Sequence, residues 1–235
     1  MIKLIAFDAD DTLWHTENIF VETQHKFADI LSHYCDIDEI HHQIGQKEKA
    51  NIAFFGYGIK GFTLSMIETA IELSEGKVSA QDIHEIVLLG KAMLRHPLHT
   101  LPHVTETLKK LHGSYKLAII TKGDLLDQNN KINESGLAHF FDYLEVVSEK
   151  DTATYEKLFK TWEIAPENMM MIGNSLPSDV LPILELGGYG IHIPYESTAV
   201  IEQTTKQGSG PKFKEVSSIK EIPAIVEDIN LKYLI

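Results

Sequence analysis

The sequence predicts an α/β fold: a doubly wound parallel sheet with a helical block inserted after its first strand. From Pro102 onward, apolar runs of strand length alternate with segments of helical length, a pattern typical of parallel strands joined by right-handed crossovers. From Thr16 to about Arg95, in contrast, apolar residues recur at helical spacing. One strand precedes this block, so the block interrupts the sheet in the sequence.

The expected elements follow in chain order. The first strand is the apolar run Ile2–Phe7, which ends abruptly in carboxylates. Within the helical block, Ser79 and Asp82 form a capping-box pattern that begins a helix, and Pro97 and Pro102 close the block. Later strands are expected at 115–120, 144–147, 169–172 and 189–193, and helices at 104–111, 125–135, 155–162 and 177–186. The predicted domains are therefore an α/β core of residues 1–14 and 98–235 and a helical cap of residues 15–97, which we expect to be mobile over the loop after the first strand.

Length, charge and cysteine content limit the class of protein. At 235 residues the chain can bury a full core. Its formal net charge of −13 argues against a nucleic-acid partner, and no apolar run reaches the ~18 residues of a membrane span. Cys35 is the only cysteine, which excludes an intrachain disulfide and favours a reducing compartment. We expect a cytoplasmic protein with no membrane partner, and the sequence leaves its oligomeric state open.

Asp8 and Asp10 directly follow the first strand. Ligands of open α/β sheets bind at the carboxyl ends of strands. Two carboxylates held close together repel each other unless a cation lies between them or their pKa values separate. This arrangement suits one nucleophile, one acid/base and a divalent metal ion, although an acidic turn explains the two residues equally well when they are considered alone.

Polar groups also follow three later strands. Thr121-Lys122-Gly123 offers a hydroxyl, a cation and a glycine that lets backbone N–H groups approach an oxyanion. Lys150 follows the next strand, and Asn174 and Asp179 follow the one after. Each has an ordinary explanation by itself, as a turn hydroxyl, a solvated charge or a first-turn helix residue. The carboxyl ends of parallel strands lie at one edge of a sheet, so we expect these groups to converge.

With these residues in place, the chain resembles the haloacid dehalogenase-like hydrolase superfamily, in its phosphatase branch with a helical cap of the C1 type. The motifs of the superfamily stand here as Asp8-Ala9-Asp10-Asp11-Thr12, Thr121, Lys150 and Gly173-Asn174-Ser175-Leu176-Pro177-Ser178-Asp179. The resemblance covers nearly the whole chain and implies a Rossmann-like core.

The resemblance implies a covalent mechanism. Asp8 would attack phosphorus and form an aspartyl-phosphate. Asp10 would protonate the leaving oxygen and later deprotonate the attacking water, and Thr12 would hold Asp10 in register.

The other motifs would bind the phosphoryl group. Thr121 and the backbone of Lys122 and Gly123 would hold phosphoryl oxygens, and the active-site lysine would neutralise negative charge. Lys150 is favoured for this role because it lies nearer the strand end, but a proline often follows the lysine in this family and Asp151 follows here. Lys157 therefore remains an alternative.

Mg²⁺ is the cofactor that the resemblance implies. It would be bound by Asp8, the backbone carbonyl of Asp10, and Asn174 and Asp179 of the fourth motif. The first acidic position of that motif is Asn174 here, so one charge is missing, and the sequence leaves open whether Asn174 binds the metal directly.

Gly56-Tyr57-Gly58-Ile59-Lys60-Gly61 matches a dinucleotide-binding pattern, but it lies in the helical block, whereas that fingerprint requires a preceding strand. We interpret it as a loop between cap helices, with Tyr57 and Lys60 as candidates for substrate contact. A plain helix–helix turn is an equally good interpretation.

The predicted function is hydrolysis of small phosphorylated metabolites by a Mg²⁺-dependent phosphatase. The alternatives are a 2-haloacid dehalogenase or a phosphomutase on the same fold, or a catalytically idle domain that binds a phosphorylated ligand. The sequence does not name the substrate: nucleoside monophosphates, sugar phosphates and phosphoglycolate all remain open.

Overall fold

The computed structural model describes residues 1–195, 204–205 and 207–233. It forms two compact units. The first comprises Met1–His15, Leu98–Lys122 and Gln128–Ile235, and the second comprises Thr16–Pro97 with Gly123–Asp127.

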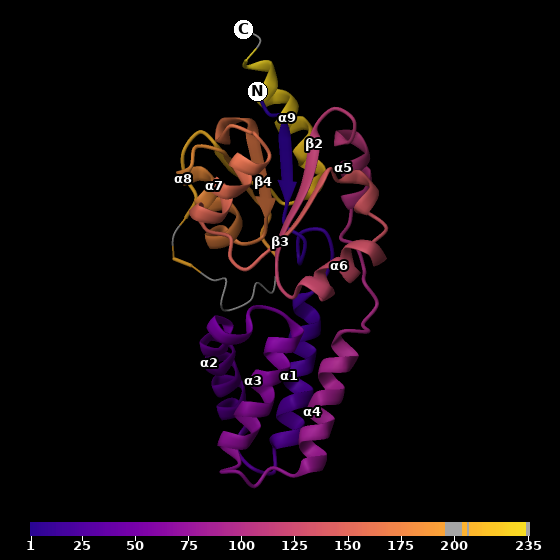
Figure 1. The fold of residues 1–235 in the computed structure, drawn as a ribbon, viewed down its shortest axis with the longest axis vertical. Helices are drawn as coiled ribbons and strands as arrows, with labels where there is room; N and C mark the ends of the chain where they lie inside the picture. Colours follow the sequence, from indigo (N-terminus) through magenta and orange to yellow (C-terminus); the bar gives the residue numbers. More distant parts are fainter. Residues whose placement is uncertain (196–203, 206, 234–235) are drawn as a thin grey trace. The chain divides into compact units, whose positions relative to one another are not determined.

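The first unit contains a parallel sheet in the order β3-β2-β1-β4-β5-β6 (Figure 1). The strands are β1 (Leu4–Phe7), β2 (Lys116–Lys122), β3 (Tyr143–Val147), β4 (Met169–Gly173), β5 (Tyr189–His192) and β6 (Phe213–Glu215). Every pair is parallel, and β1 lies between β2 and β4. The predicted α/β fold with a parallel sheet is confirmed.

Helices cover both faces of this sheet. Alternate residues of a strand point to opposite faces, so Ile5 and Phe7 pack on one side and Leu4 and Ala6 on the other. The first side is covered by α5 (Val104–Leu111), α9 (Ile222–Leu231) and Ile132 of α6 (Leu125–Glu134). The second side is covered by α7 (Thr152–Thr161) and α8 (Leu181–Glu185). Short 3₁₀ turns lie at Ala138–Phe140, Pro166–Asn168 and Ile219–Glu221.

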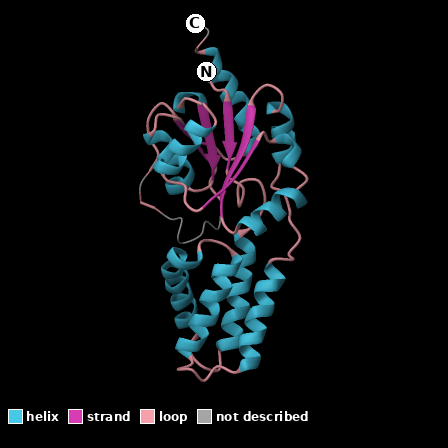
Figure 2. Ribbon diagram, in the orientation of Figure 1, coloured by secondary structure: helices cyan, strands magenta, loops and turns pink. Residues whose placement is uncertain are grey.

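The second unit is built from the helices α1 (Glu17–Leu31), α2 (Ile37–Phe55), α3 (Ile59–Leu73) and α4 (Ala80–Met93) (Figure 2). They share a core of their own, which includes Phe27, Ile44, Phe62 and Met66. The predicted capping box is present at the start of α4: Ser79 accepts from the backbone of Asp82, and the Asp82 carboxylate accepts in return from the backbone N–H of Ser79.

The segment 177–186 departs from the single helix that we expected. It begins as a π-helical turn, η3 (Leu176–Val180), and continues as the short α8. The reason is Pro182, which has no N–H to donate to the carbonyl of Ser178 four residues earlier. The Tyr155 hydroxyl donates to that carbonyl instead, at 3.1 Å.

Two elements near the C-terminus were not anticipated. β6 has only three residues, too few for a recognisable alternation, and α9 follows it. Among the described residues, no helix is long and apolar enough to cross a membrane.

Candidate active site

Asp8 stands at the carboxyl end of β1, where the strand turns into a tight loop. Its backbone N–H donates to the backbone carbonyl of Ile172 in the neighbouring β4 (2.8 Å), so the sheet fixes its position. The loop turns at Asp11, whose φ of 60° lies in the left-handed region that Asp tolerates better than most residues. After this turn the Thr12 hydroxyl donates back to Asp8 Oδ2 (3.2 Å).

Lys150 joins Asp8 to Asp179. Its ammonium donates to Asp8 Oδ1 and, at 2.8 Å, to Asp179 Oδ1, and all three residues are buried. Burial raises the pKa of Asp8 to about 7 even though the ammonium of Lys150 acts to lower it. Burial also acts to lower the pKa of Lys150, but the carboxylates of Asp179 and Asp8 outweigh it and raise that pKa. We call these three residues the buried triad; it contains two carboxylates and one ammonium.

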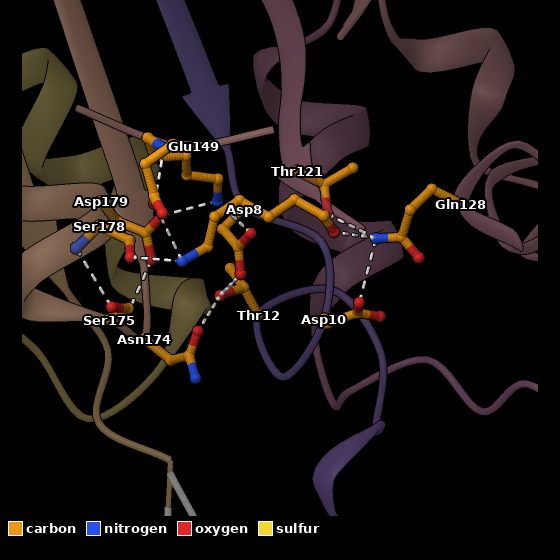
Figure 3. A network of polar contacts seen from close by, with 12 residues as sticks. Asp8, Asp10, Thr12, Thr121, Gln128, Glu149, Asn174, Ser175, Ser178 and Asp179 are labelled. Carbon is orange, nitrogen blue, oxygen red and sulfur yellow. Dashed lines mark hydrogen bonds and ion pairs between the residues drawn. The ribbon is translucent and has the colours of Figure 1, made fainter. Parts of the chain in front are cut away.

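The loop after β4 holds Asp179 in this position. The backbone N–H of Ser175 donates to Asp179 Oδ2 (3.0 Å). A Cβ atom at Gly173 would collide with the Asp179 carboxylate, so only glycine fits there. The labelled side chains of Asp8, Asp179 and Asn174 lie close to one another (Figure 3).

Asn174 is held from two sides. Its side-chain oxygen lies 3.4 Å from the Thr12 hydroxyl. Its backbone carbonyl accepts from His192 Nε2 (3.0 Å), and His192 Nδ1 lies 2.9 Å from Glu215 on β6. The unanticipated strand β6 thus contributes to the support of the fourth motif.

The end of β2 places Thr121 and Lys122 beside the other motifs. Thr121 is buried, and Lys122 Nζ donates to Ser178 Oγ (2.9 Å) and lies 3.4 Å from Glu149. Gly123 follows with φ 136°, a conformation that favours glycine.

Asp10 is held by groups that the sequence did not identify. Its carboxylate accepts from Trp14 Nε1 (2.8 Å), Gln128 Nε2 (3.0 Å) and Lys131 Nζ (3.2 Å). We had expected Thr12 to hold Asp10, but the Thr12 hydroxyl is directed to Asp8 and Asn174 instead.

The two lysine alternatives differ in their surroundings. Lys150 is buried in the triad, whereas Lys157 is exposed on α7. The structure brings Lys150, and not Lys157, to Asp8.

Tyr57 and Lys60 belong to the helical unit. Tyr57 lies in the turn between α2 and α3, whereas Lys60 is in the first turn of α3. Lys60 Nζ forms an ion pair with Asp124 at 2.9 Å, and its side chain is 52% exposed. Because α2 and not a strand precedes this turn, the dinucleotide interpretation is excluded.

Comparison with known proteins identifies the family. The model of the haloacid dehalogenase-like hydrolases matches residues 2–187. The chain belongs to this family. It is therefore a hydrolase, as the resemblance of its motifs predicted.

Individual relatives of this haloacid dehalogenase-like hydrolase carry phosphatase names. The glyceraldehyde 3-phosphate phosphatase of Methanothermobacter thermautotrophicus is 26% identical, over 94% of this chain and all of that protein. The human N-acylneuraminate-9-phosphatase is 23% identical, over 98% of this chain and 96% of that protein. A crystal structure of a haloacid dehalogenase-like family hydrolase from Xanthomonas campestris is 41% identical with a TM-score of 0.88, over 98% of this chain and 93% of that one.

Oxygen donors suited to a hard cation lie beside the buried triad. Asp8 Oδ2 and Asn174 Oδ1 are both close to the Thr12 hydroxyl, so they are near each other. Within the described residues, no three carboxylate, imidazole or thiolate groups are arranged to hold a metal by themselves. Mg²⁺ does not require three such groups, because it keeps several waters and takes one or two carboxylates from a protein. The donor set of this hydrolase therefore fits Mg²⁺.

Proposed function

We propose that this hydrolase is a Mg²⁺-dependent phosphatase that cleaves monoesters of small phosphorylated metabolites through an aspartyl-phosphate at Asp8. The observation that carries the proposal is the separation of two carboxylates into different environments. Asp8 is buried against Lys150, whereas the side chain of Asp10 is 28% exposed and held by neutral and cationic donors. Such a division suits a nucleophile and an acid/base. The phosphatase names of both curated relatives support the same class of reaction.

In the first step, a carboxylate oxygen of Asp8 forms a bond to phosphorus while the bond from phosphorus to the leaving oxygen breaks. Asp10 donates a proton to that oxygen, so the product leaves as an alcohol. Lys150 offsets negative charge at Asp8, and the Thr121 hydroxyl with the backbone N–H groups of Lys122 and Gly123 binds phosphoryl oxygens.

In the second step, water attacks the phosphorus of the aspartyl-phosphate. Asp10, now a carboxylate, accepts a proton from that water, and the bond between phosphorus and the Asp8 oxygen breaks. Inorganic phosphate leaves, and Asp8 and Asp10 return to their starting states.

Mg²⁺ would be held by Asp8, the backbone carbonyl of Asp10, Asn174 and Asp179, and would supply positive charge for the phosphoryl oxygens. The net negative charge of the buried triad and the oxygen donors beside it support this assignment. The amide of Asn174 supplies an oxygen without a charge.

The helical segment 15–97 is proposed to act as a cap that selects the substrate, over a catalytic core of residues 1–14 and 98–235. Tyr57 and Lys60 are its candidate contacts. The two curated relatives act on different phosphorylated compounds according to their names, so substrate choice is not a property of the family as a whole.

The test is phosphate release from a panel of phosphorylated metabolites and p-nitrophenyl phosphate, with Mg²⁺ and then with excess chelator. We expect turnover that requires Mg²⁺ and that Asp8→Asn abolishes, because an amide cannot replace the attacking carboxylate. Full turnover in chelator would overturn the metal assignment, and a tenth or more of wild-type turnover in Asp8→Asn would overturn the covalent mechanism.

Parallel assays separate the alternatives. Halide release from 2-chloropropionate without phosphate release would indicate a dehalogenase. That reaction needs no acid for its leaving group, so it gives no role to the donors that hold Asp10. Isomerisation of a sugar phosphate would indicate a phosphomutase. Phosphate-ester binding without turnover would indicate an idle domain.

A further inference from the structure

Gln128 is a polar side chain that is almost completely buried on α6, with 1% of its surface exposed. Burying an amide is unfavourable unless hydrogen bonds compensate for the lost water. Here Nε2 has three acceptors: Thr121 Oγ1 at 2.6 Å, Asp10 Oδ2 at 3.0 Å and the carbonyl of Lys122 at 3.1 Å. One amide group thus joins the loop after β1 to the end of β2 (Figure 3).

The other oxygen of the Asp10 carboxylate is also held. Trp14 Nε1 donates to Oδ1 at 2.8 Å, and Lys131 Nζ lies 3.2 Å from Oδ1 and 3.4 Å from Oδ2. Gln128 and Lys131 are three residues apart on α6, so they present to the same face of the helix. Donors on both oxygens restrict rotation of the carboxylate about its last side-chain bond.

A purely structural role for Gln128 would be satisfied by its bonds to Thr121 and Lys122. The bond to Asp10 is different, because this carboxylate is partly exposed and, of the donors named above, its Oδ2 would otherwise keep the longer contact of 3.4 Å from Lys131. An acid/base group acts only when it lies within hydrogen-bonding reach of the reacting oxygen, and small misplacements are costly.

We propose that Gln128 is a positioning residue for the acid/base step: its amide fixes the Asp10 carboxylate relative to Thr121, the residue assigned to the phosphoryl group. The inference rests on the proposed phosphatase activity and assigns a role within it. Gln128 itself does not touch the substrate.

The leaving group separates the two roles, because a purely structural role would affect all phosphate esters equally. An alkyl alcohol is strongly basic and needs a proton as it departs, whereas p-nitrophenolate departs without one. The value of kcat/KM reports the steps up to and including the first phosphoryl transfer, so the later attack of water does not contribute. We expect Gln128→Met to lower kcat/KM about ten- to a hundredfold for the preferred alkyl phosphate, because a misplaced acid loses part of the roughly 10²–10⁴-fold that general acid catalysis contributes. For p-nitrophenyl phosphate the loss should stay below about threefold.

The controls use the same helix and the same carboxylate. Asn129→Ala changes an exposed amide next to Gln128 and should leave both substrates unaffected. Asp10→Asn should show the leaving-group pattern in a stronger form, and adding Gln128→Met to Asp10→Asn should cost nothing further on the alkyl substrate. If Gln128→Met fails to fold, Gln128→Asn keeps an uncharged amide but shortens its reach toward Asp10 by one methylene, and the same pattern is expected.

Equal losses on both substrates, no loss on either, or full additivity with Asp10→Asn would each overturn the role of Gln128 while leaving the phosphatase proposal intact. Failure of the wild-type protein to release phosphate from any substrate would instead overturn the proposed function, and the positioning role with it.

Discussion

Asp8 and Asp179 share the single ammonium of Lys150, so the buried triad keeps one more negative charge than positive. Burial raises the pKa of Asp8 from 3.8 to about 7. Between about pH 4 and pH 7, Asp8 therefore keeps its proton in the folded protein, whereas the unfolded chain has already released it. By linkage, the contribution of Asp8 to the free energy of unfolding falls as pH rises from about 4 to about 7.

We predict that Asp8→Asn is more stable than the wild type at pH 8 in chelator, by on the order of 1–3 kcal/mol, and that the difference shrinks toward pH 5. The variant has no carboxylate to ionise, and Lys150 keeps Asp179 as its partner. Urea unfolding at the two pH values measures the difference. A variant that is less stable than the wild type at pH 8 would show that the ion pair with Lys150 outweighs the burial of Asp8.

Asn174 stands at the first acidic position of the fourth motif. We predict that Asn174→Asp binds Mg²⁺ more tightly, because a carboxylate would replace a neutral amide oxygen beside Asp8. The increase in melting temperature on adding Mg²⁺ measures this without relying on turnover, and it should be larger in the variant. The variant without metal should melt lower than the wild type, because a third carboxylate would then lie next to the triad. A smaller increase with Mg²⁺ would mean that Asn174 does not face the metal.

Sequence reasoning was most informative for residues at strand ends. Asp8, Lys150 and Asp179 could be brought together because parallel strands end at one edge of the sheet. Gln128 and Lys131 could not, because helical spacing shows that they share a face of α6 but not what that face contacts. Trp14 is fully buried, and its hydrogen bond to Asp10 depends on the orientation of the indole, which no sequence pattern encodes.

At the scale of elements, the loop between β4 and α8 depends on the absence of a side chain at Gly173. We predict that Gly173→Ala destabilises the protein by about 1–3 kcal/mol, the usual cost of overpacking, because the new methyl group must displace the Asp179 carboxylate. The melting temperature and the rate of phosphate release should both fall. Gly45→Ala is the matched control, since Gly45 lies in α2 with no atom near its missing Cβ, and it should gain up to about 1 kcal/mol from helix propensity.

The elements that sequence patterns failed to describe have specific causes. The expected helix at 177–186 is divided because Pro182 cannot donate to Ser178, and the acceptor is satisfied by Tyr155, which lies on a different helix. β6 is short and at the edge of the sheet, so its three residues carry no periodic signal. In contrast, the helix at Val104–Leu111 was expected with the same bounds, because the flanking Pro102 and Gly113 mark both ends.

At the scale of the whole molecule, the α/β unit and the helical unit have separate hydrophobic cores. Asp8, Asp10 and Lys150 lie in the α/β unit, whereas Tyr57, Lys60 and the proposed phosphoryl-binding Gly123 lie in the helical unit. The phosphatase names of relatives only 23–26% identical to this chain attach to different compounds. If the helical unit chooses the substrate, changes there should alter which phosphates are hydrolysed and not whether hydrolysis occurs.

Lys60 tests this division of tasks. In the structure it pairs with Asp124 within the helical unit, and an exposed pair of this kind contributes at most about 1 kcal/mol to stability. We predict that Lys60→Ala lowers kcat/KM for the preferred metabolite about ten- to a hundredfold, the loss of one charge-assisted hydrogen bond, and leaves p-nitrophenyl phosphate nearly unchanged. Asp124→Asn is the matched control: it removes the charge of the pair, keeps an acceptor for the backbone N–H of Asp127, and leaves Lys60 available. Selective loss in Lys60→Ala alone would assign the lysine to the substrate. Similar losses in both variants on both substrates would assign it to the ion pair, and no loss in either would remove Lys60 from the candidate contacts.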